Sequence, residues 1–583
     1  MTSPSLSAAD TAPDVQSPDA GVRQASILGM RARFSSAQAG LVLLGLLAGA
    51  LALAPLLSLL SLAWQGDPEI WPHLAAYVIP HALGQTAALL GGVAAFTILF
   101  GVSAAWLLTA YEIPGRRLLT WLLPLPLAVP TYIVAYVYVD LMEASGPVQT
   151  AFRALFGFRS PQDYWFPSIR SLGGAIFLFS IVLYPYVYLA ARTAFQLQSG
   201  LYLETARVLG GRSWRLFRDI TLPLARPAIV IGLTLALLET LNDIGAAEYL
   251  GVQTLTLSIM STWVNRDSLP GAAQIACVML LVVVGLIAVE QFARRRRSVI
   301  SHVQKPLPLR RRRLPPLQRW LATTVCAVPV LLGFAAPAGY LLMEAVRRSL
   351  ITGIDASLAG HALTTLAFAG CATLCVLALG FGTVAGARLL RARTLDVSVR
   401  IAGLGYAIPG TVLALGLLAP LVAMDDVLNW ISRAVAGVPV GLVVAGSGAA
   451  VVTAYVIRFM AIATGFAQAG FGRVSREFDD SARTSGASPW TVIRTVHLPL
   501  VRPAVWGAAL LVFVDCLKEL PATLMLRPLN VETLSTYIYQ FATRGNFEEG
   551  ALAAMLIVAV GILPVIYIAR HADLAMDAAP RPD

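Results

Sequence analysis

The chain has 583 residues, of which 57% are hydrophobic and only 13% are charged. A water-soluble protein of this composition would expose far too much apolar surface, so the sequence indicates an integral membrane protein. The formal net charge of +11 does not call for a nucleic-acid partner, because the basic clusters flank apolar runs, where they can contact anionic lipid head groups.

Apolar runs follow a polar tail. The first 38 residues are rich in Ser, Ala, Pro and Asp, which predicts a disordered cytoplasmic tail. Crossing about 30 Å of hydrocarbon takes roughly 20 helical residues, and twelve runs are long enough. The predicted spans are 39–64, 83–109, 118–142, 171–193, 227–250, 271–293, 320–344, 362–386, 400–423, 440–465, 503–525 and 549–570. The first run is too long for a signal-peptide core, so we expect it to be retained.

The distribution of charge predicts the orientation. An even number of spans places both termini on one side of the membrane, and Lys and Arg in short loops are retained in the cytoplasm. With the N-terminus inside, 32 of the 43 basic residues lie in or beside cytoplasmic segments and 9 lie outside. We therefore expect both termini in the cytoplasm. The five cysteines all fall in apolar segments and predict neither a disulfide framework nor a zinc site.

A stretch rich in Pro and Arg, RRRRSVISHVQKPLPLRRRRLPPLQR at 294–319, separates the spans into two sets of six. Its composition resists helix packing and suits a solvated cytoplasmic linker. We expect a first half at 39–293, a second half at 320–570 and a cytoplasmic tail at 571–583.

The two halves share short sequences. His-Ala-Leu at 81–83 recurs at 361–363, and Ala-Val-Pro at 128–130 matches Ala-Ile-Pro at 407–409. Offsets near 279 residues indicate a duplicated unit. Because each half has an even number of spans, the copies share one orientation, which predicts a pseudo-twofold axis along the membrane normal and a central pathway between them.

The polar loop before the fifth span is also repeated before the eleventh. ETARVLGGRSWRLFRDITLPLARPA at 204–228 and DSARTSGASPWTVIRTVHLPLVRPA at 480–504 are identical at 11 of 25 positions. A glycine in each copy permits a turn between two short helices. The prolines that follow, at 223, 227, 499 and 503, are expected to end the cytoplasmic segment. Trp and Arg on such a helical knob suit docking of a partner; the alternative is a basic loop lying on lipid phosphates.

These repeated segments, 204–223 and 480–499, are called the coupling loops below. Their spacing is similar to the EAA loop of binding-protein-dependent ABC importer permeases, in which Glu-Ala-Ala is followed by Gly and then by Ile-x-Leu-Pro. The resemblance extends over nearly the whole chain and implies that one cytoplasmic ATPase subunit grips each loop. The residues expected to make this contact, with the tryptophans added for their apolar area, are Glu204, Ala206, Gly210, Trp214, Leu222 and Pro223, and Asp480, Ala482, Gly486, Trp490, Leu498 and Pro499.

ATP must then be bound by another polypeptide. A phosphate-binding loop needs the Lys of GxxxxGK[ST], and the two lysines, Lys305 before Pro306 and Lys518 before Glu519, do not fit it. The resemblance implies a transport subunit of a bacterial inner membrane that is not an enzyme and binds no cofactor itself. Its expected partners are two copies of an ATPase subunit, which hold ATP and Mg, a periplasmic substrate-binding protein docking near 143–170 and 526–548, and membrane lipid.

Ionisable residues occur inside two equivalent spans, where they are functional candidates by default. Glu239, Asn242 and Asp243 lie in the fifth span, and Asp515, Lys518 and Glu519 occupy the same positions of the eleventh. Their i, i+3, i+4 spacing predicts one helical face for each trio, roughly 18–24 Å into the membrane. We expect these faces to converge and line the translocation pathway. An internal ion-pair network, with Lys518 bound to Asp515 or Asp243, explains the charges equally well; Arg458, in the tenth span, has no assigned partner.

The sequence around these charges resembles the ferric-iron importer permeases whose double-length members fuse both halves. The matching segments are ETLNDIGAAEYLGVQTLT at 239–256 and DCLKELPATLMLRP at 515–528. Related permeases for thiamine and for organophosphonates share much of this architecture and remain alternatives. Iron(III) prefers carboxylate and phenolate oxygens, and the third and fourth spans contain Tyr132, Tyr136, Tyr184, Tyr186 and Tyr188. Aromatic residues in spans usually pack or form interfacial belts, so no metal site is assigned.

The expected fold is an all-α integral membrane protein, a type I ABC importer transmembrane domain of twelve helices in two pseudo-equivalent halves. Alternating access would be driven mechanically by the ATPase. Two other classes compete with this interpretation. An ion-coupled secondary transporter also has twelve spans but has no use for paired coupling loops. A membrane-embedded enzyme would need a convergent nucleophile, metal or acid pair, which the sequence does not provide.

Overall fold

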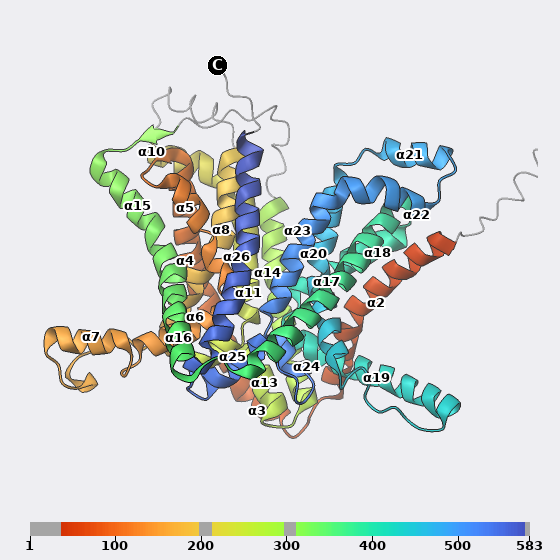
Figure 1. Cartoon of the computed structure of the whole chain (residues 1–583), viewed down its shortest axis with the longest axis horizontal. Helices are drawn as coiled ribbons and strands as arrows, with labels where there is room; N and C mark the ends of the chain where they lie inside the picture. Colours follow the sequence, from red (N-terminus) through yellow and green to blue (C-terminus); the bar gives the residue numbers. More distant parts are fainter. Residues whose placement is uncertain (1–35, 198–212, 296–310, 578–583) are drawn as a thin grey trace, which may run out of the picture.

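A computed structural model describes residues 36–197, 213–295 and 311–577, and its long elements are all helices (Figure 1). The first half contains α2 (Ser36–Gln65), α3 (Trp71–His73), η1 (Leu74–Val78), α4 (Ile79–Ala110), β1 (Tyr111–Glu112), α5 (Arg116–Leu122), η2 (Leu125–Ala128), α6 (Thr131–Met142), α7 (Pro147–Phe156), η3 (Pro161–Asp163), α8 (Leu172–Leu197), α10 (Ser213–Leu216), η4 (Phe217–Thr221), α11 (Leu222–Asn242), α12 (Gly245–Tyr249), α13 (Leu255–Val264) and α14 (Leu269–Arg295).

The second half repeats this order from the linker onward. It contains β2 (Arg312–Arg313), α15 (Pro316–Val330), η5 (Leu331–Ala335), α16 (Ala336–Thr352), α17 (Ala356–Leu390), α18 (Arg393–Ala402), η6 (Gly405–Ala407), α19 (Gly410–Ala436), α20 (Gly448–Gly472), α21 (Arg476–Thr484), α22 (Pro489–Val492), η7 (Ile493–His497), α23 (Leu498–Leu517), α24 (Pro521–Leu526), α25 (Leu534–Thr543) and α26 (Phe547–Asp577).

Eleven helices of the described residues are long and apolar enough to cross a membrane, and a bent pair makes up the twelfth. The bent pair corresponds to the predicted span 118–142, which is not one straight helix: its two parts, 116–128 and 131–156, meet at 92°. Pro130 lies at the break, where it cannot donate a backbone hydrogen bond. Pro409 separates α18 from α19 at the equivalent place, so the predicted span 400–423 begins ten residues late, at Gly410.

The predicted boundaries also need correction near the linker and tail. The linker ends before residue 319, because α15 already begins at Pro316. Arg312 and Arg313 pair in parallel with Tyr111 and Glu112 as two-residue strands, and Arg313 Nε lies 2.9 Å from Glu112 Oε2. The last helix continues into the predicted tail, to Asp577. Residues 1–35 of the predicted tail and most of the linker lie outside the described residues, and residues 36–38 already belong to α2.

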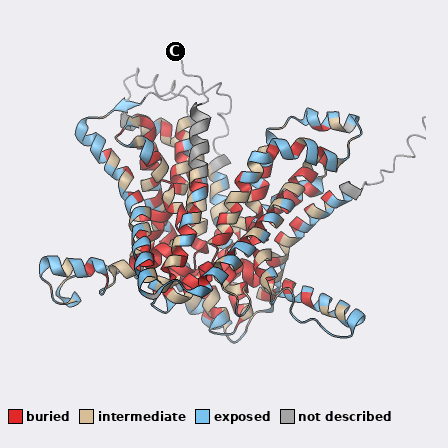
Figure 2. Ribbon diagram, in the orientation of Figure 1, coloured by how far each residue is buried: buried red, intermediate tan, exposed pale blue. Residues whose placement is uncertain are grey.

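The helices form two lobes that touch at one end and diverge toward the other (Figure 1). The diverging ends carry α10 on one lobe and α21 and α22 on the other, so both coupling loops emerge from the same end. At the opposite end, α7 and the last turns of α19 project sideways with exposed apolar side chains, whereas buried residues concentrate where the lobes meet (Figure 2). This arrangement agrees with the predicted axis running from one membrane face to the other.

The lobes do not coincide with the sequence halves, because the first span of each half packs on the other half. Helix α2 contacts α17, α18 and α19 of the second half as well as α14 of its own. Likewise α15 contacts α4 and α16 contacts α6 of the first half, although α16 also packs on α26 of its own half. The approach is close: a Cβ added to Gly416 of α19 would collide with the carbonyl oxygen of Pro55 in α2. Each lobe is therefore completed by a helix from the other half.

The prolines of the coupling loops lie inside continuous helices, so no helix break separates the cytoplasmic segment from the span that follows. Helix α11 follows η4 without interruption, and α23 follows α22 and η7 within one continuous helix, Pro489–Leu517. Each helix contains one π-helical turn directly before its Leu-Pro, at Phe217–Thr221 and Ile493–His497. The wider turn accommodates proline, which lacks an N–H and crowds the carbonyl of the preceding turn.

Candidate functional site

The two charged trios lie where α11 and α23 end inside the fold. Helix α11 ends at Asn242 and α23 at Leu517, so the trios do not continue along one helical face as predicted. The Asp243 carboxylate accepts a hydrogen bond from the backbone N–H of Ala246, at 2.7 Å, and one from the Thr131 hydroxyl. Asp243 therefore binds the first turn of the short helix α12, which competes with continuation of α11.

The break after α23 in the second half is held in the same way. Glu519 accepts hydrogen bonds from the backbone N–H groups of Ala522 and Thr523, both at 3.0 Å, and from the Thr523 hydroxyl at 2.7 Å. It thereby binds the first turn of α24, as Asp243 does for α12. The similar geometry of the two breaks supports the inferred duplication.

All six predicted pathway residues line one cavity of about 80 Å³ between the halves. The prediction that the two trios converge is confirmed. Other lining residues include Pro130, Tyr132, Tyr186, Tyr406 and Arg458. Four carboxylates and two cationic side chains therefore surround a space large enough to hold water.

Ion pairs connect part of this cluster. Lys518 Nζ lies 2.9 Å from Asp515 Oδ1, which confirms the first of the two partners proposed for Lys518. Arg458, whose role the sequence left open, is buried with its Nη1 atom 3.4 Å from Glu519 Oε1. No group of three or more His, Cys, Asp or Glu side chains suited to a metal occurs in the described residues.

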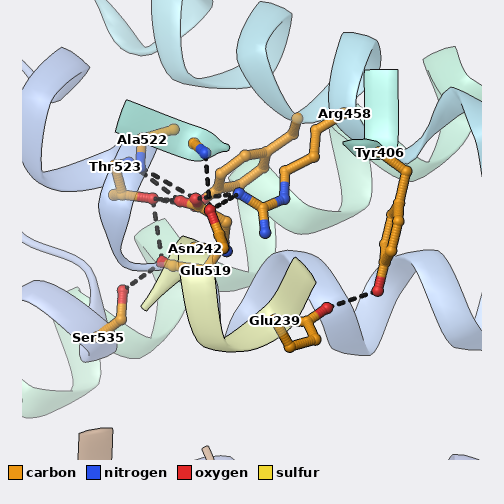
Figure 3. Close-up of polar contacts among 10 residues, drawn as sticks. Glu239, Asn242, Tyr406, Arg458, Glu519, Ala522, Thr523 and Ser535 are labelled. Atoms are coloured by element: carbon orange, nitrogen blue, oxygen red, sulfur yellow. Dashed lines mark hydrogen bonds and ion pairs between the residues drawn. The ribbon is translucent and has the colours of Figure 1, made fainter. Parts of the chain in front are cut away.

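Polar contacts also cross between the halves (Figure 3). The Asn242 side-chain oxygen accepts hydrogen bonds from the backbone N–H of Gly410, at 2.7 Å, and from Arg458 Nη1, at 2.8 Å. Tyr406 donates its hydroxyl to Glu239 Oε1 at 2.5 Å. Sequence reasoning missed Tyr406 as a site residue, although it directly precedes the repeated Ala407-Ile408-Pro409.

The five tyrosines noted in the sequence lie in three different surroundings. Tyr132 and Tyr186 line the cavity. Tyr136 packs against Tyr249, with ring centroids 4.6 Å apart. Tyr184 and Tyr188 belong to a separate apolar cluster nearer the coupling loops, where the Tyr184 hydroxyl donates to the Leu123 carbonyl at 2.9 Å.

A second cavity, of about 470 Å³, lies between the lobes on the coupling-loop side of the charged cluster. Its walls include Leu235 and Leu238, which precede Glu239 in α11, and Leu511 and Val514, which precede Asp515 in α23. On the opposite side the halves are joined by a hydrogen bond of 2.6 Å from the Tyr539 hydroxyl to Glu248 Oε2. The structure is open toward the coupling loops and closed on the other side.

The second coupling loop forms the helical knob expected for it. Gly486 separates α21 from α22 with a φ of +74°, a left-handed conformation that favours glycine. The Ala487 N–H binds the Ala482 carbonyl at 3.0 Å, which closes the end of α21. Trp490 is 62% exposed, and Leu498 is also exposed. Large apolar side chains are thus available to a partner.

The base of this knob is fixed by an ionic contact. Asp479 Oδ2 lies 2.6 Å from Arg388 Nε, and Asp479 Oδ1 lies 2.6 Å from His497 Nε2. Burial opposes ionisation of the Asp479 carboxyl, but the His497 and Arg388 contacts outweigh it and hold its pKa below the usual value. Asp480, the neighbouring loop residue, forms a more exposed pair with Arg391 at 3.1 Å.

The first coupling loop is described only in part. Glu204, Ala206 and Gly210 lie outside the described residues. Trp214 lies in α10, and its side chain is not described, whereas Leu222 and Pro223 begin α11. The comparison between the loops therefore rests on the Leu-Pro ends and the π-helical turns before them.

Comparison with known proteins supplies the family. Residues 97–298 and 378–577 each match the sequence profile of the binding-protein-dependent transport system inner membrane component. The chain belongs to this family. It is a multi-pass ABC importer permease of the type I architecture, with the family domain present twice, and its relatives are transport subunits.

Relatives of this permease differ in their cargo. It is 24% identical to the probable ABC transporter permease protein y4fN of Sinorhizobium fredii, over 81% of this chain and 84% of the relative. It is 22% identical to the Fe(3+)-transport system permease protein FbpB 2 of Haemophilus influenzae, over 84% and 90%. It is also 30% identical to the molybdenum transport system permease protein ModB of Escherichia coli, over 35% of this chain and 88% of the relative. The family membership removes the secondary transporter from consideration and leaves the cargo open.

Proposed function

We propose that this permease imports ferric iron released by a periplasmic binding protein, with both termini and both coupling loops in the cytoplasm. The observation that carries the proposal is the charge of the residues that line the central cavity. Four of them are acidic, Glu239, Asp243, Asp515 and Glu519, and two are basic, Lys518 and Arg458. A surplus of carboxylates attracts a cation and repels an oxyanion. Carboxylates are also ligands suited to hard metal cations.

The similarity to FbpB 2 supports iron because it extends over most of both chains. Relatives that carry molybdenum, sulfate and 2-aminoethylphosphonate match shorter parts of this chain. Molybdate and sulfate are oxyanions, which the excess of carboxylates disfavours. Thiamine is a cation, and 2-aminoethylphosphonate carries an ammonium group beside its anionic phosphonate. Thiamine and organophosphonates therefore remain the alternative cargoes.

The proposed mechanism is alternating access. In the present state the lobes diverge toward the coupling loops, and the cavity beside the charged cluster lies on that side. Two ATPase subunits binding ATP would draw the loops at 204–223 and 480–499 together, close this side and separate Tyr539 from Glu248. The loops extend as continuous helices into α11 and α23, whose far ends carry the charged trios, so movement of the loops would be transmitted to the pathway.

The decisive experiment measures ATP hydrolysis and cargo uptake by this chain with its ATPase subunit in lipid vesicles. Binding protein loaded with iron(III), thiamine, 2-aminoethylphosphonate or molybdate is added to separate samples. We expect stimulation by the iron-loaded protein alone, together with uptake of iron. Stimulation by another loaded protein would replace the cargo and retain the mechanism, whereas failure of the ATPase to associate would refute the coupling role of the loops.

A further inference from the structure

Glu239 differs from the other acids of the cavity in how its charge is balanced. Asp515 pairs with Lys518 and Glu519 pairs with Arg458. Asp243 is held by the Ala246 N–H and the Thr131 hydroxyl. Among the described residues, no cation lies within ion-pair distance of Glu239, and its side-chain contact is the neutral hydroxyl of Tyr406.

The duplication shows how this difference arose. Glu239 and Asp515 occupy equivalent positions, but the residue three positions later is Asn242 in the first half and Lys518 in the second. Lys518 neutralises its acid internally, whereas Asn242 turns its oxygen toward Gly410 and Arg458. Lys518 also interacts electrostatically with Glu239, but its direct ion pair is with Asp515. A partly buried carboxylate that no cation contacts directly is unfavourable, which favours a cation arriving from outside the chain.

Phenol oxygens surround this carboxylate. Tyr186 and Tyr406 line both the charged cavity and the larger cavity beside it. Tyr132 lines the charged cavity, is only 4% exposed and has a hydroxyl without a hydrogen-bond partner in the described residues. An unsatisfied buried hydroxyl is destabilising unless a ligand occupies the site during the working cycle.

We propose that Glu239, Tyr186 and Tyr406, with Tyr132 at the deeper side, form a transient coordination site for iron(III) on its way through the permease. The inference rests on the proposed iron transport and goes beyond it by naming the ligands. One carboxylate and phenolate oxygens match the preference of a hard trivalent cation. The cavity that these residues line, with a volume of about 80 Å³, is large enough to admit a metal ion with water.

Coordination requires loss of phenol protons. Each phenolate that binds iron(III) releases one proton to water in the cavity on the coupling-loop side, and the metal keeps its oxidation state. Glu239 accepts the Tyr406 hydrogen bond before binding and binds the metal through the same face afterwards. When the ion leaves for the cytoplasmic side, water returns the protons, so the site is restored without an additional reactant.

The test uses the full-length chain in nanodiscs, titrated with iron(III) nitrilotriacetate. Binding to phenolate oxygen produces visible phenolate-to-iron(III) charge-transfer absorption. We expect this absorption in the wild type, a loss of most of it in the Y186F/Y406F double variant and an affinity at least about tenfold lower in E239Q, the range for loss of one ligand interaction. Gallium(III) should compete, and molybdate should not.

One variant provides a matched control. Y184F removes a buried phenol that lines neither cavity. It should retain the absorption. Absence of the absorption in the wild type, or an equal loss in Y184F and Y186F/Y406F, would overturn the site.

Uptake into vesicles separates failure of the site from failure of the proposed function. If the wild type imports iron and E239Q and Y186F/Y406F import it within about twofold of that rate, the coordination site is wrong and iron transport stands. If the wild type imports no iron but imports another cargo, the proposed function itself is wrong. Iron import reduced at least about tenfold in E239Q and retained in Y184F would support both.

Discussion

The ends of α11 and α23 have the same backbone plan and different charge balance. In both, the span stops midway and a carboxylate, Asp243 or Glu519, binds the N–H groups of the next short helix. The second half supplies its own cations, Lys518 and Arg458, whereas the first half carries Asn242 where Lys518 would stand. Duplication thus preserved the break in the helix, and divergence left one acid of the first half, Glu239, without a cation in direct contact.

Removing Arg458 should cause the largest loss of stability, because Glu519 would remain buried without its charge partner. We expect R458L to lower the free energy of unfolding by about 3–5 kcal/mol, measured by thermal unfolding of the solubilised chain. R458L/E519Q should recover part of this loss. R391L removes a half-exposed pair with Asp480 and should cost less than about 1 kcal/mol; equal losses in R458L and R391L would contradict the difference in burial.

Asp479 tests whether the second coupling loop is held by charge. We expect D479N to destabilise the loop locally by about 2 kcal/mol, since it loses hydrogen bonds to charged partners, and to speed hydrogen exchange in α21. D480N, in the exposed neighbouring pair, should have little effect. The Asp479 pKa is lowered, so its contribution is complete above the ordinary value of about 3.9 and disappears as pH falls through the lowered pKa. A difference between wild type and D479N that grows on acidification would refute this account.

Replacing Gly486 tests whether the same loop depends on its backbone conformation rather than on side-chain packing. An added Cβ would meet no atom within 4 Å, but φ is +74°, so G486A should cost about 1–2 kcal/mol through the backbone alone. We expect weaker stimulation of the partner ATPase in vesicles. G84A is the control, because Gly84 is also free of neighbours within 4 Å and lies in helix α4. Unchanged coupling in G486A would show that the loop tolerates another conformation.

The smallest effect is expected from removing the hydrogen bond that joins the halves on the closed side of the cavity. Y539F removes one hydrogen bond between the halves, to Glu248. Such a bond is worth about 1 kcal/mol, so its loss should shift the conformational equilibrium roughly fivefold toward the outward-open state. Spin-label distances between α13 and α25 would measure it. Y537F removes a hydrogen bond within the second half, to Asp355, and should leave these distances unchanged. An equal shift in both variants would argue against a latch between the halves.

The sequence predicted the spans, the duplication and the meeting of the two charged trios, because these follow from apolar run length and repeated spacing. It did not predict the breaks at Pro130 and after Asn242, since an apolar run continues across each of them. Arg458 and Tyr406 were missed as site residues for another reason. Their partners, Glu519 and Glu239, lie on other spans, and the register between packed helices is set by tertiary contacts that periodicity does not report.

The exchange of first spans constrains the order in which the chain can be assembled. Among the described spans α2 is made first, and it packs against α14 of its own half, but its other main partners, α17, α18 and α19, are made only after the linker. The face of α2 that these helices cover must therefore remain in contact with lipid until the second half is synthesised. Neither half can complete its own lobe in isolation, so joining both in one polypeptide guarantees that every α2 finds its acceptor in the same molecule.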